Sequence, residues 1–186
     1  MAITAIYAGS FDPITRGHED LIERSCEFVD HLVVAVAVNS SKRALFTTEE
    51  RVELIRAATA DNKHVEVTQF EGLLVDFARK IGAKLNIRGL RAVSDFEYEF
   101  QMALMNRHMS ENFETVFMVP SVETTYISSS VVREVAQHNG NLKGLVHPAV
   151  AKALAKKFEN GLVRGERKRE AGGGKRNNAR TTSDVR

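Results

Sequence analysis

Short apolar segments alternate with amphipathic segments along the first 160 residues, and this alternation constrains the fold more than any other feature. Five segments have the length and residue types of strands: 3–8, 32–38, 65–69, 84–88 and 116–119. Helical spacing of apolar residues follows them, over 18–29, 47–60, 73–81, 95–108, 129–137 and 148–159. Because strands that alternate with helices form βαβ units, we predict an α/β fold: a Rossmann-like, doubly wound five-stranded parallel sheet with flanking helices.

Local signals support these elements. Residues 32–38 contain no polar side chain, which is typical of a strand buried on both faces of a sheet. Thr47 and Glu50 have the spacing of a capping box, and Gly82 follows a helical segment as a C-terminal cap would. Pro148 suits the first turn of the last helix. On the helix expected over 95–108, apolar residues such as Phe96 and Phe100 share one side.

The positive charge is concentrated at the C-terminal end. Residues 161–186 carry eight Lys or Arg and three Asp or Glu. Residues 1–160 carry 18 Lys or Arg and 21 Asp or Glu. Glycines and charges dominate this tail, so it cannot bury enough apolar surface to become ordered. We therefore predict one domain over 1–160 and a basic, disordered tail over 161–186. The mildly acidic body argues against a specific nucleic-acid partner.

Several protein classes are excluded by what the sequence lacks. A single cysteine, Cys26, allows neither an intrachain disulfide nor a site built from several cysteines. The longest apolar run, 32–38, is far shorter than the roughly 20 residues of a membrane-spanning helix. The N-terminal residues do not resemble a secretory signal. We therefore expect a cytoplasmic protein with no membrane partner.

Residues suited to binding anions follow four of the predicted strands. In an open parallel sheet, ligands bind outside the carboxyl ends of the strands, where the strand order reverses. The segments that follow the strands are rich in Gly, Arg, Lys, His and Ser: 9–18, 39–46, 88–91 and 121–130. Such residues indicate a site for an anion, and we expect this anion to be a phosphate.

The segment GSFDPITRGH follows the first strand. Gly9 allows a tight turn and close approach of a ligand, and Thr15 can cap a helix that begins near Gly17. His18 then lies in the first helical turn, where it can donate to a phosphate oxygen beside free backbone N–H groups. A first-turn histidine taken alone is more often structural. The dinucleotide fingerprint and the P-loop motif are both absent.

The other segments add cations and hydroxyl groups. Lys42 can reach a phosphate, whereas Arg43 is better explained as a solvated surface charge. Arg88 and Arg91 flank Gly89, and two guanidinium groups at the expected ligand edge favour phosphate binding.

Three serines, Ser128, Ser129 and Ser130, enter the next helix. Helix capping explains one of them and not all three. No spacing supports a serine-nucleophile triad or a zinc site.

Four segments together resemble a known enzyme family. GSFDPITRGH resembles the signature of the nucleotidyltransferases related to class I aminoacyl-tRNA synthetases, with the T-x-G-H element at residues 15–18. With SSK, IRGLRAVSDFEYE and YISSSVVRE in the same order, residues 3–158 resemble phosphopantetheine adenylyltransferases. Position 10 usually carries Thr in this family and here carries Ser, which preserves the hydroxyl group.

The resemblance implies an activity and a set of residues. The family transfers the adenylyl group of ATP to 4′-phosphopantetheine by direct in-line displacement, giving dephospho-coenzyme A and pyrophosphate. By position, catalysis is implied for His18, Lys42 and Arg91, and contact with the acceptor for Ser10, Lys42, Leu74 and Arg88. The implied ATP contacts are Gly9, Ser10, Phe11, His18, Gly89, Leu90, Arg91, Glu99, Thr124, Thr125, Tyr126, Ile127, Ser128, Ser129 and Ser130.

The resemblance also implies Mg²⁺ as cofactor, a homohexamer and feedback inhibition by coenzyme A. Two alternatives stay open from the sequence. One is a nucleotidyltransferase for another phosphate acceptor, such as nicotinate mononucleotide. The other is a non-catalytic nucleotide-binding or RNA-associated protein that uses its basic tail.

Overall fold

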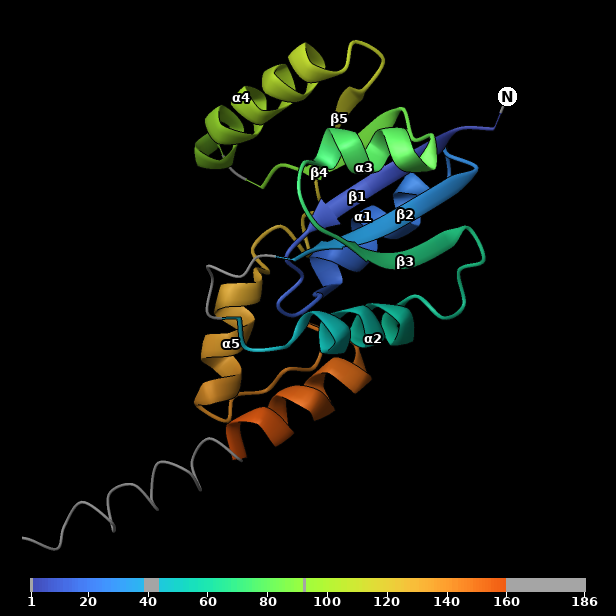
Figure 1. The fold of residues 1–186 in the computed structure, drawn as a ribbon. Coiled ribbons are helices and arrows are strands. Elements are labelled where there is room, and N and C mark those ends of the chain that lie inside the picture. Colours follow the sequence, from blue (N-terminus) through green and yellow to red (C-terminus); the bar gives the residue numbers. More distant parts are fainter. Residues whose placement is uncertain (1, 39–43, 92, 160–186) are drawn as a thin grey trace, which may run out of the picture.

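The protein forms the predicted α/β fold, seen in a computed structural model that describes residues 2–38, 44–91 and 93–159 (Figure 1). The strands are β1 (Thr4–Gly9), β2 (His31–Ala37), β3 (Val65–Phe70), β4 (Leu85–Gly89) and β5 (Glu114–Met118). The helices are α1 (Arg16–Ser25), α2 (Thr48–Ala58), α3 (Leu74–Ile81), α4 (Val93–Met109) and α5 (Ser129–Gln137), followed by a helix over 148–159. The predicted tail at 161–186 lies outside the described residues.

All five strands are parallel, in the order β3-β2-β1-β4-β5. From β1 the chain first builds outward through β2 and β3, and then crosses back to add β4 and β5 on the other side. The order therefore reverses between β1 and β4, which places the expected ligand crevice at the carboxyl ends of these two strands.

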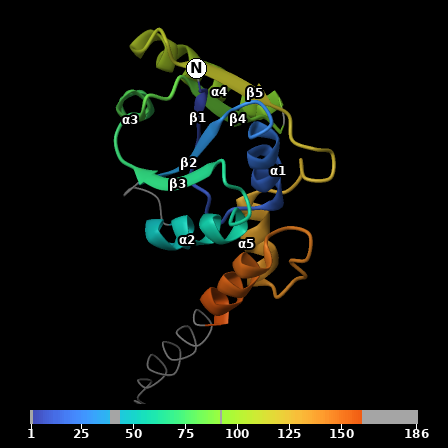
Figure 2. The same cartoon turned by 90° about the vertical axis from the view of Figure 1, so that its right-hand side faces the viewer.

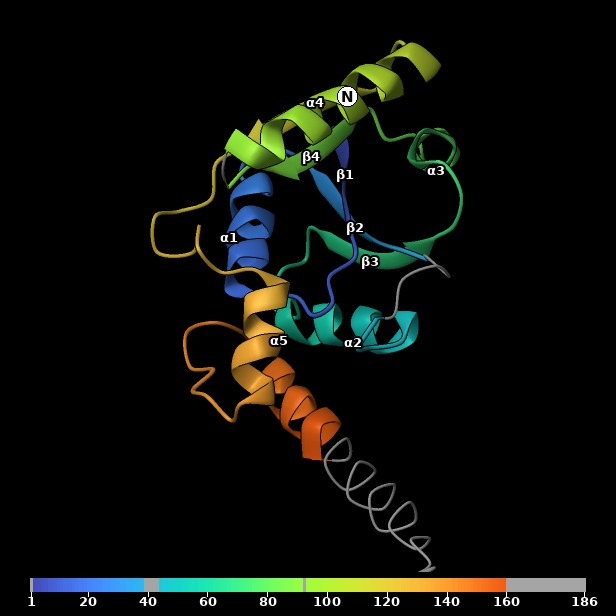
Figure 3. The same ribbon diagram turned by 90° about the vertical axis from the view of Figure 1, so that its left-hand side faces the viewer.

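Apolar side chains fill both faces of the sheet, as the unbroken apolar run at 32–38 predicts. On one face, Val34 and Val36 pack in a core that α1, α2, α5 and the helix over 148–159 also enter. On the opposite face, Val33 and Ala35 pack with Val75 of α3. Figures 2 and 3 show α3 and α4 on one side of the sheet, with α1 and α2 on the other.

Two helices differ from the sequence expectation. The helix predicted over 18–29 is α1, which begins two residues earlier and ends at Ser25, because a turn follows in which Val29 N–H donates to the Ser25 carbonyl. Helix α4 carries the expected row of large apolar residues, but much of it is exposed: Phe96 is 43% and Phe100 45% accessible. Within the described part of the chain, no helix has the length and hydropathy to cross a membrane.

Candidate active site

A cavity of about 470 Å³ lies at the carboxyl ends of β1 and β4, where the strand order reverses. Of the residues suggested by the sequence, it brings together Gly9, Ser10, Phe11, His18, Arg88, Gly89, Arg91, Glu99, Thr124, Ile127, Ser128, Ser129 and Ser130. Apart from Glu99 of α4, these residues come from three segments, which follow β1, β4 and β5. Their convergence follows from the parallel sheet, because each segment leaves a strand at the same edge.

His18 lies in the first turn of α1, after the N-cap residue Thr15. Its Nδ1 is 3.0 Å from the backbone N of Thr15. A backbone N–H can only donate, so Nδ1 accepts and the neutral ring carries its proton on Nε2. Burial, with the nearby cations Arg91 and Arg88, lowers the pKa of His18 to about 4. At neutral pH the ring is therefore an uncharged donor at the positive end of a helix.

Aromatic side chains hold the His18 ring. The ring of Phe11 meets it edge-on, with centroids 5.1 Å apart, and Tyr7 meets Phe11 in the same way at 5.3 Å. Phe11 has a φ of +44°, which is unusual for a residue with a large side chain. Gly17 supports the same turn, because a Cβ there would lie 3.2 Å from the carbonyl oxygen of Thr124. The Nε2–H donor of His18 is thus fixed in place before any ligand binds.

Arg88, at the end of β4, forms a bidentate ion pair with Glu99 of α4. Its Nε lies 2.7 Å from Glu99 Oε2, Nη2 bonds Oε1, and Nη1 donates to the carbonyl of Ala8. The sequence suggested both residues for ligand contacts, and the structure shows that they also bind each other. The pair fixes the guanidinium at the cavity wall and offsets much of its charge.

Arg91 is paired more loosely. Its Nε lies 3.2 Å from the Asp95 carboxylate, and the side chain is 44% exposed. Among the described residues, its two Nη groups have no hydrogen-bond partner, so Arg91 presents donors that a phosphate group could take.

The three serines at the start of α5 all have partners within the chain. Ser128 Oγ caps the helix by accepting from Val131 N at 3.2 Å, and Ser129 Oγ donates to the Pro13 carbonyl at 2.8 Å. Ser130 Oγ accepts from Arg133 at 3.3 Å. As the sequence interpretation stated, helix capping accounts for one serine, Ser128, whereas the bonds of Ser129 and Ser130 to other groups were not foreseen. All three serines still line the cavity beside the helix N-terminus.

Some suggested residues lie elsewhere. Leu90, Thr125 and Tyr126 do not line the cavity, and Leu74 packs against the core on the α3 side of the sheet. Lys42, with its neighbours at 39–43, lies outside the described residues. The ligand contacts of these positions stay predictions.

Sequence reasoning missed several residues at or behind the cavity. Tyr7, Asp95 and Tyr98 line it. Asp12 is buried within the loop that follows β1, and Arg51 is buried against this loop. Asp12 stands inside the GSFDPITRGH segment, which could have drawn attention to it. Nothing in the sequence pattern marks Arg51, which lies on a helix far along the chain.

Comparison with known proteins relates the chain to nucleotidyltransferases. Residues 6–135 match the model of the cytidylyltransferase-like family. A phosphopantetheine adenylyltransferase from Geotalea daltonii is 56% identical over 154 residues, which cover 83% of this chain and 96% of that protein.

Solved structures share the fold at much lower identity. The nicotinic acid mononucleotide adenylyltransferase of Plasmodium falciparum, complexed with NaAD, has a TM-score of 0.63 and 15% identity, covering 84% of this chain and 96% of that one. A Vibrio parahaemolyticus protein assigned as a nicotinate-nucleotide adenylyltransferase has a TM-score of 0.63 and 17% identity. The match covers 86% of this chain and 93% of that one.

Proposed function

The chain belongs to the phosphopantetheine adenylyltransferase family of nucleotidyltransferases, and we propose that it transfers the adenylyl group of ATP to 4′-phosphopantetheine. The products are dephospho-coenzyme A and pyrophosphate. The observation that carries this proposal is the convergence of His18, Arg88 and Arg91 with the first turn of α5 on one cavity.

The chemistry of this cavity suits an in-line displacement. The acceptor phosphate is already an anion, so no base is required to activate it. Its oxygen bonds to the α-phosphorus of ATP while the bond to the pyrophosphate oxygen breaks. Positioning two polyanions can contribute roughly 7–11 kcal/mol to such a reaction. The Nε2–H of His18 supplies one fixed donor for the α-phosphoryl oxygens.

The residues divide into three proposed roles. His18, Arg91 and Lys42 stabilise the charge that develops on the reacting phosphates. Ser10, Lys42, Leu74 and Arg88 hold the acceptor. The proposed ATP contacts are the cavity residues Gly9, Phe11, Gly89, Glu99, Thr124 and 127–130, together with Leu90, Thr125 and Tyr126, which lie outside the cavity lining.

An acceptor assay tests this proposal. Purified protein is mixed with ATP and either 4′-phosphopantetheine or nicotinate mononucleotide, and pyrophosphate release is measured. We expect release with 4′-phosphopantetheine at a rate at least a hundredfold above that with nicotinate mononucleotide. Preference for the second acceptor would instead place the chain with the enzymes that share only its fold.

We propose that Mg²⁺ enters the site bound to ATP and is not held by the protein alone. Asp95 and Glu99 line the cavity, but each carboxylate is paired with an arginine. The described residues include no group of three side chains suited to hold a metal. Magnesium often binds substrate phosphates and water with few protein ligands. Chelation with EDTA should therefore stop turnover, while calorimetry with MgCl₂ alone should show no saturable binding.

We propose that the exposed apolar face of α4 is covered in a homohexamer. Phe96, Phe100, Leu104 and Met105 are each 43–52% exposed, and the rings of Phe96 and Phe100 stack at 5.5 Å. An exposed apolar patch of this kind is typical of a protein–protein interface. Mass photometry of the purified protein should give six times the chain mass of 20.7 kDa.

We also propose that coenzyme A inhibits the enzyme by entering the same cavity, because it contains both the pantetheine and the adenylyl groups. Inhibition should then be competitive with 4′-phosphopantetheine. The proposed location is the cytoplasm, where ATP is supplied.

A further inference from the structure

The loop of residues 10–13, between β1 and α1, carries a backbone conformation that its own sequence does not favour. Phe11 has a positive φ, and its ring contacts the ring of His18. A residue with a side chain keeps such a conformation only where its surroundings impose it. The bonds that hold this loop therefore also hold His18.

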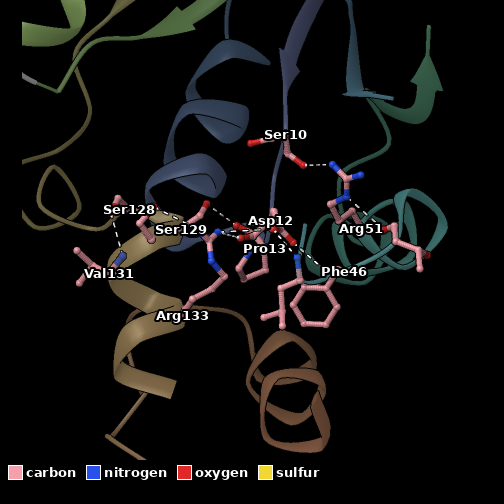
Figure 4. Close-up of polar contacts among 12 residues, drawn as sticks. Ser10, Asp12, Pro13, Phe46, Arg51, Ser128, Ser129, Val131 and Arg133 are labelled. Carbon is pink, nitrogen blue, oxygen red and sulfur yellow. Dashed lines mark hydrogen bonds and ion pairs between the residues drawn. The ribbon is translucent and has the colours of Figure 1, made fainter. Parts of the chain in front are cut away.

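Two arginines bond to the main chain of this loop from different helices (Figure 4). Arg51 of α2 donates from Nη1 to the carbonyl of Ser10 at 2.8 Å. Arg133 of α5 donates from Nη1 to the carbonyl of Asp12. Arg51 is only 5% exposed, and among the described residues no carboxylate forms an ion pair with it. Its guanidinium group donates to the carbonyls of Ser10 and Thr47 and to the hydroxyl of Thr48, so α2 is tied to the loop through this side chain.

Asp12 completes the arrangement. Its carboxylate oxygens accept the N–H groups of Leu45 and Phe46, each at 2.9 Å, and one oxygen lies 3.6 Å from Arg133. We call Asp12, Arg51 and Arg133 the loop clamp. None of the three lines the cavity: Asp12 belongs to the loop, and the two arginines hold the loop from outside the cavity.

Arg133 joins two walls of the cavity. With Nη1 it holds the loop that supports His18, and with Nη2 it bonds Ser130 at the start of α5. Ser129 reinforces this link by donating to the Pro13 carbonyl. The distance between His18 and the α5 N-terminus therefore depends on Arg133. A displacement of about 1 Å between reacting groups can cost a hundredfold in rate.

We propose that Arg133 is a positioning residue for adenylyl transfer, which acts by holding the 10–13 loop, and through it His18, against the N-terminus of α5. This inference rests on the proposed function. It assigns a role to a residue that does not line the cavity and that the sequence analysis placed in the YISSSVVRE segment without giving it a function.

The test compares Arg133→Ala and Arg133→Lys with a matched control, Arg56→Ala. Arg56 also donates to a main-chain carbonyl, that of Val67 at 3.0 Å, but lies away from the cavity. We expect Arg133→Ala to lower kcat at least tenfold while the Kd for ATP changes less than threefold. Arg133→Lys should recover part of kcat, because an ammonium group can replace one of the bonds, and it provides the same comparison should the alanine variant unfold.

A double variant separates positioning from a general structural role. If Arg133 acts through His18, adding Arg133→Ala to His18→Ala should lower kcat by less than a further threefold. Full multiplication of the two losses, or a kcat for Arg133→Ala within twofold of Arg56→Ala, would overturn the proposal. The wild-type rate with ATP and 4′-phosphopantetheine tests the proposed function, whereas the ratios between variants test the clamp.

Discussion

Removing the imidazole of His18 tests the central feature of the site. Nδ1 is engaged with Thr15, and the lowered pKa, about 4, keeps the ring neutral at pH 7, so Nε2–H is the single donor that the ring offers to a ligand. Loss of one fixed donor to a developing anion costs about 3–4 kcal/mol, which corresponds to a kcat lower by roughly 10²–10³. We therefore expect His18→Ala to lose that factor in kcat while the Kd for ATP changes less than threefold.

The assay is steady-state pyrophosphate release, with ATP affinity measured separately by calorimetry. His64→Ala is the matched control, because His64 also bonds the main chain, at Asp30, and lies away from the cavity. Its kcat should equal that of the wild type. A fall in ATP affinity as large as the fall in kcat for His18→Ala would refute the reasoning, because the ring would then stabilise ground and transition states equally.

Three further outcomes follow from the same structure. The free energy of unfolding should fall less steeply with decreasing pH for His18→Ala than for the wild type. The pKa of His18 is lowered in the folded protein, so the unfolded chain binds more protons. The stability of the wild type therefore falls as pH drops from about 6.5 towards 4. Glu99→Ala should lower the free energy of unfolding in urea by about 1–3 kcal/mol, because Arg88 loses its partner in a partly buried site. Asp76→Ala, which removes the exposed pair with Arg79, should lower it by at most about 1 kcal/mol. Deletion of residues 163–186 should leave kcat unchanged in the pyrophosphate assay, and a large loss would show that the basic tail takes part.

Most of the architecture could be predicted from the sequence because its signals are local. Alternating apolar segments set the order of strands and helices, and the run at 32–38 correctly indicated burial on both sheet faces. The capping box at Thr47 and Glu50 is present, and Gly82 has the left-handed conformation expected of a helix cap. The edge where the residues suggested for phosphate binding gather also follows from parallel strand direction, which the connecting helices require.

Only the tertiary structure decided which partners the polar side chains take. The sequence identified Arg88 and three serines as ligand-binding candidates, but not the bonds that they form with Glu99, Pro13 and Arg133. Arg51 and Arg133 reach loop 10–13 from 41 and 121 residues away, so no local pattern connects them to it. Strand order and helix packing bring such groups together, whereas periodicity and capping depend on neighbours within one or two turns.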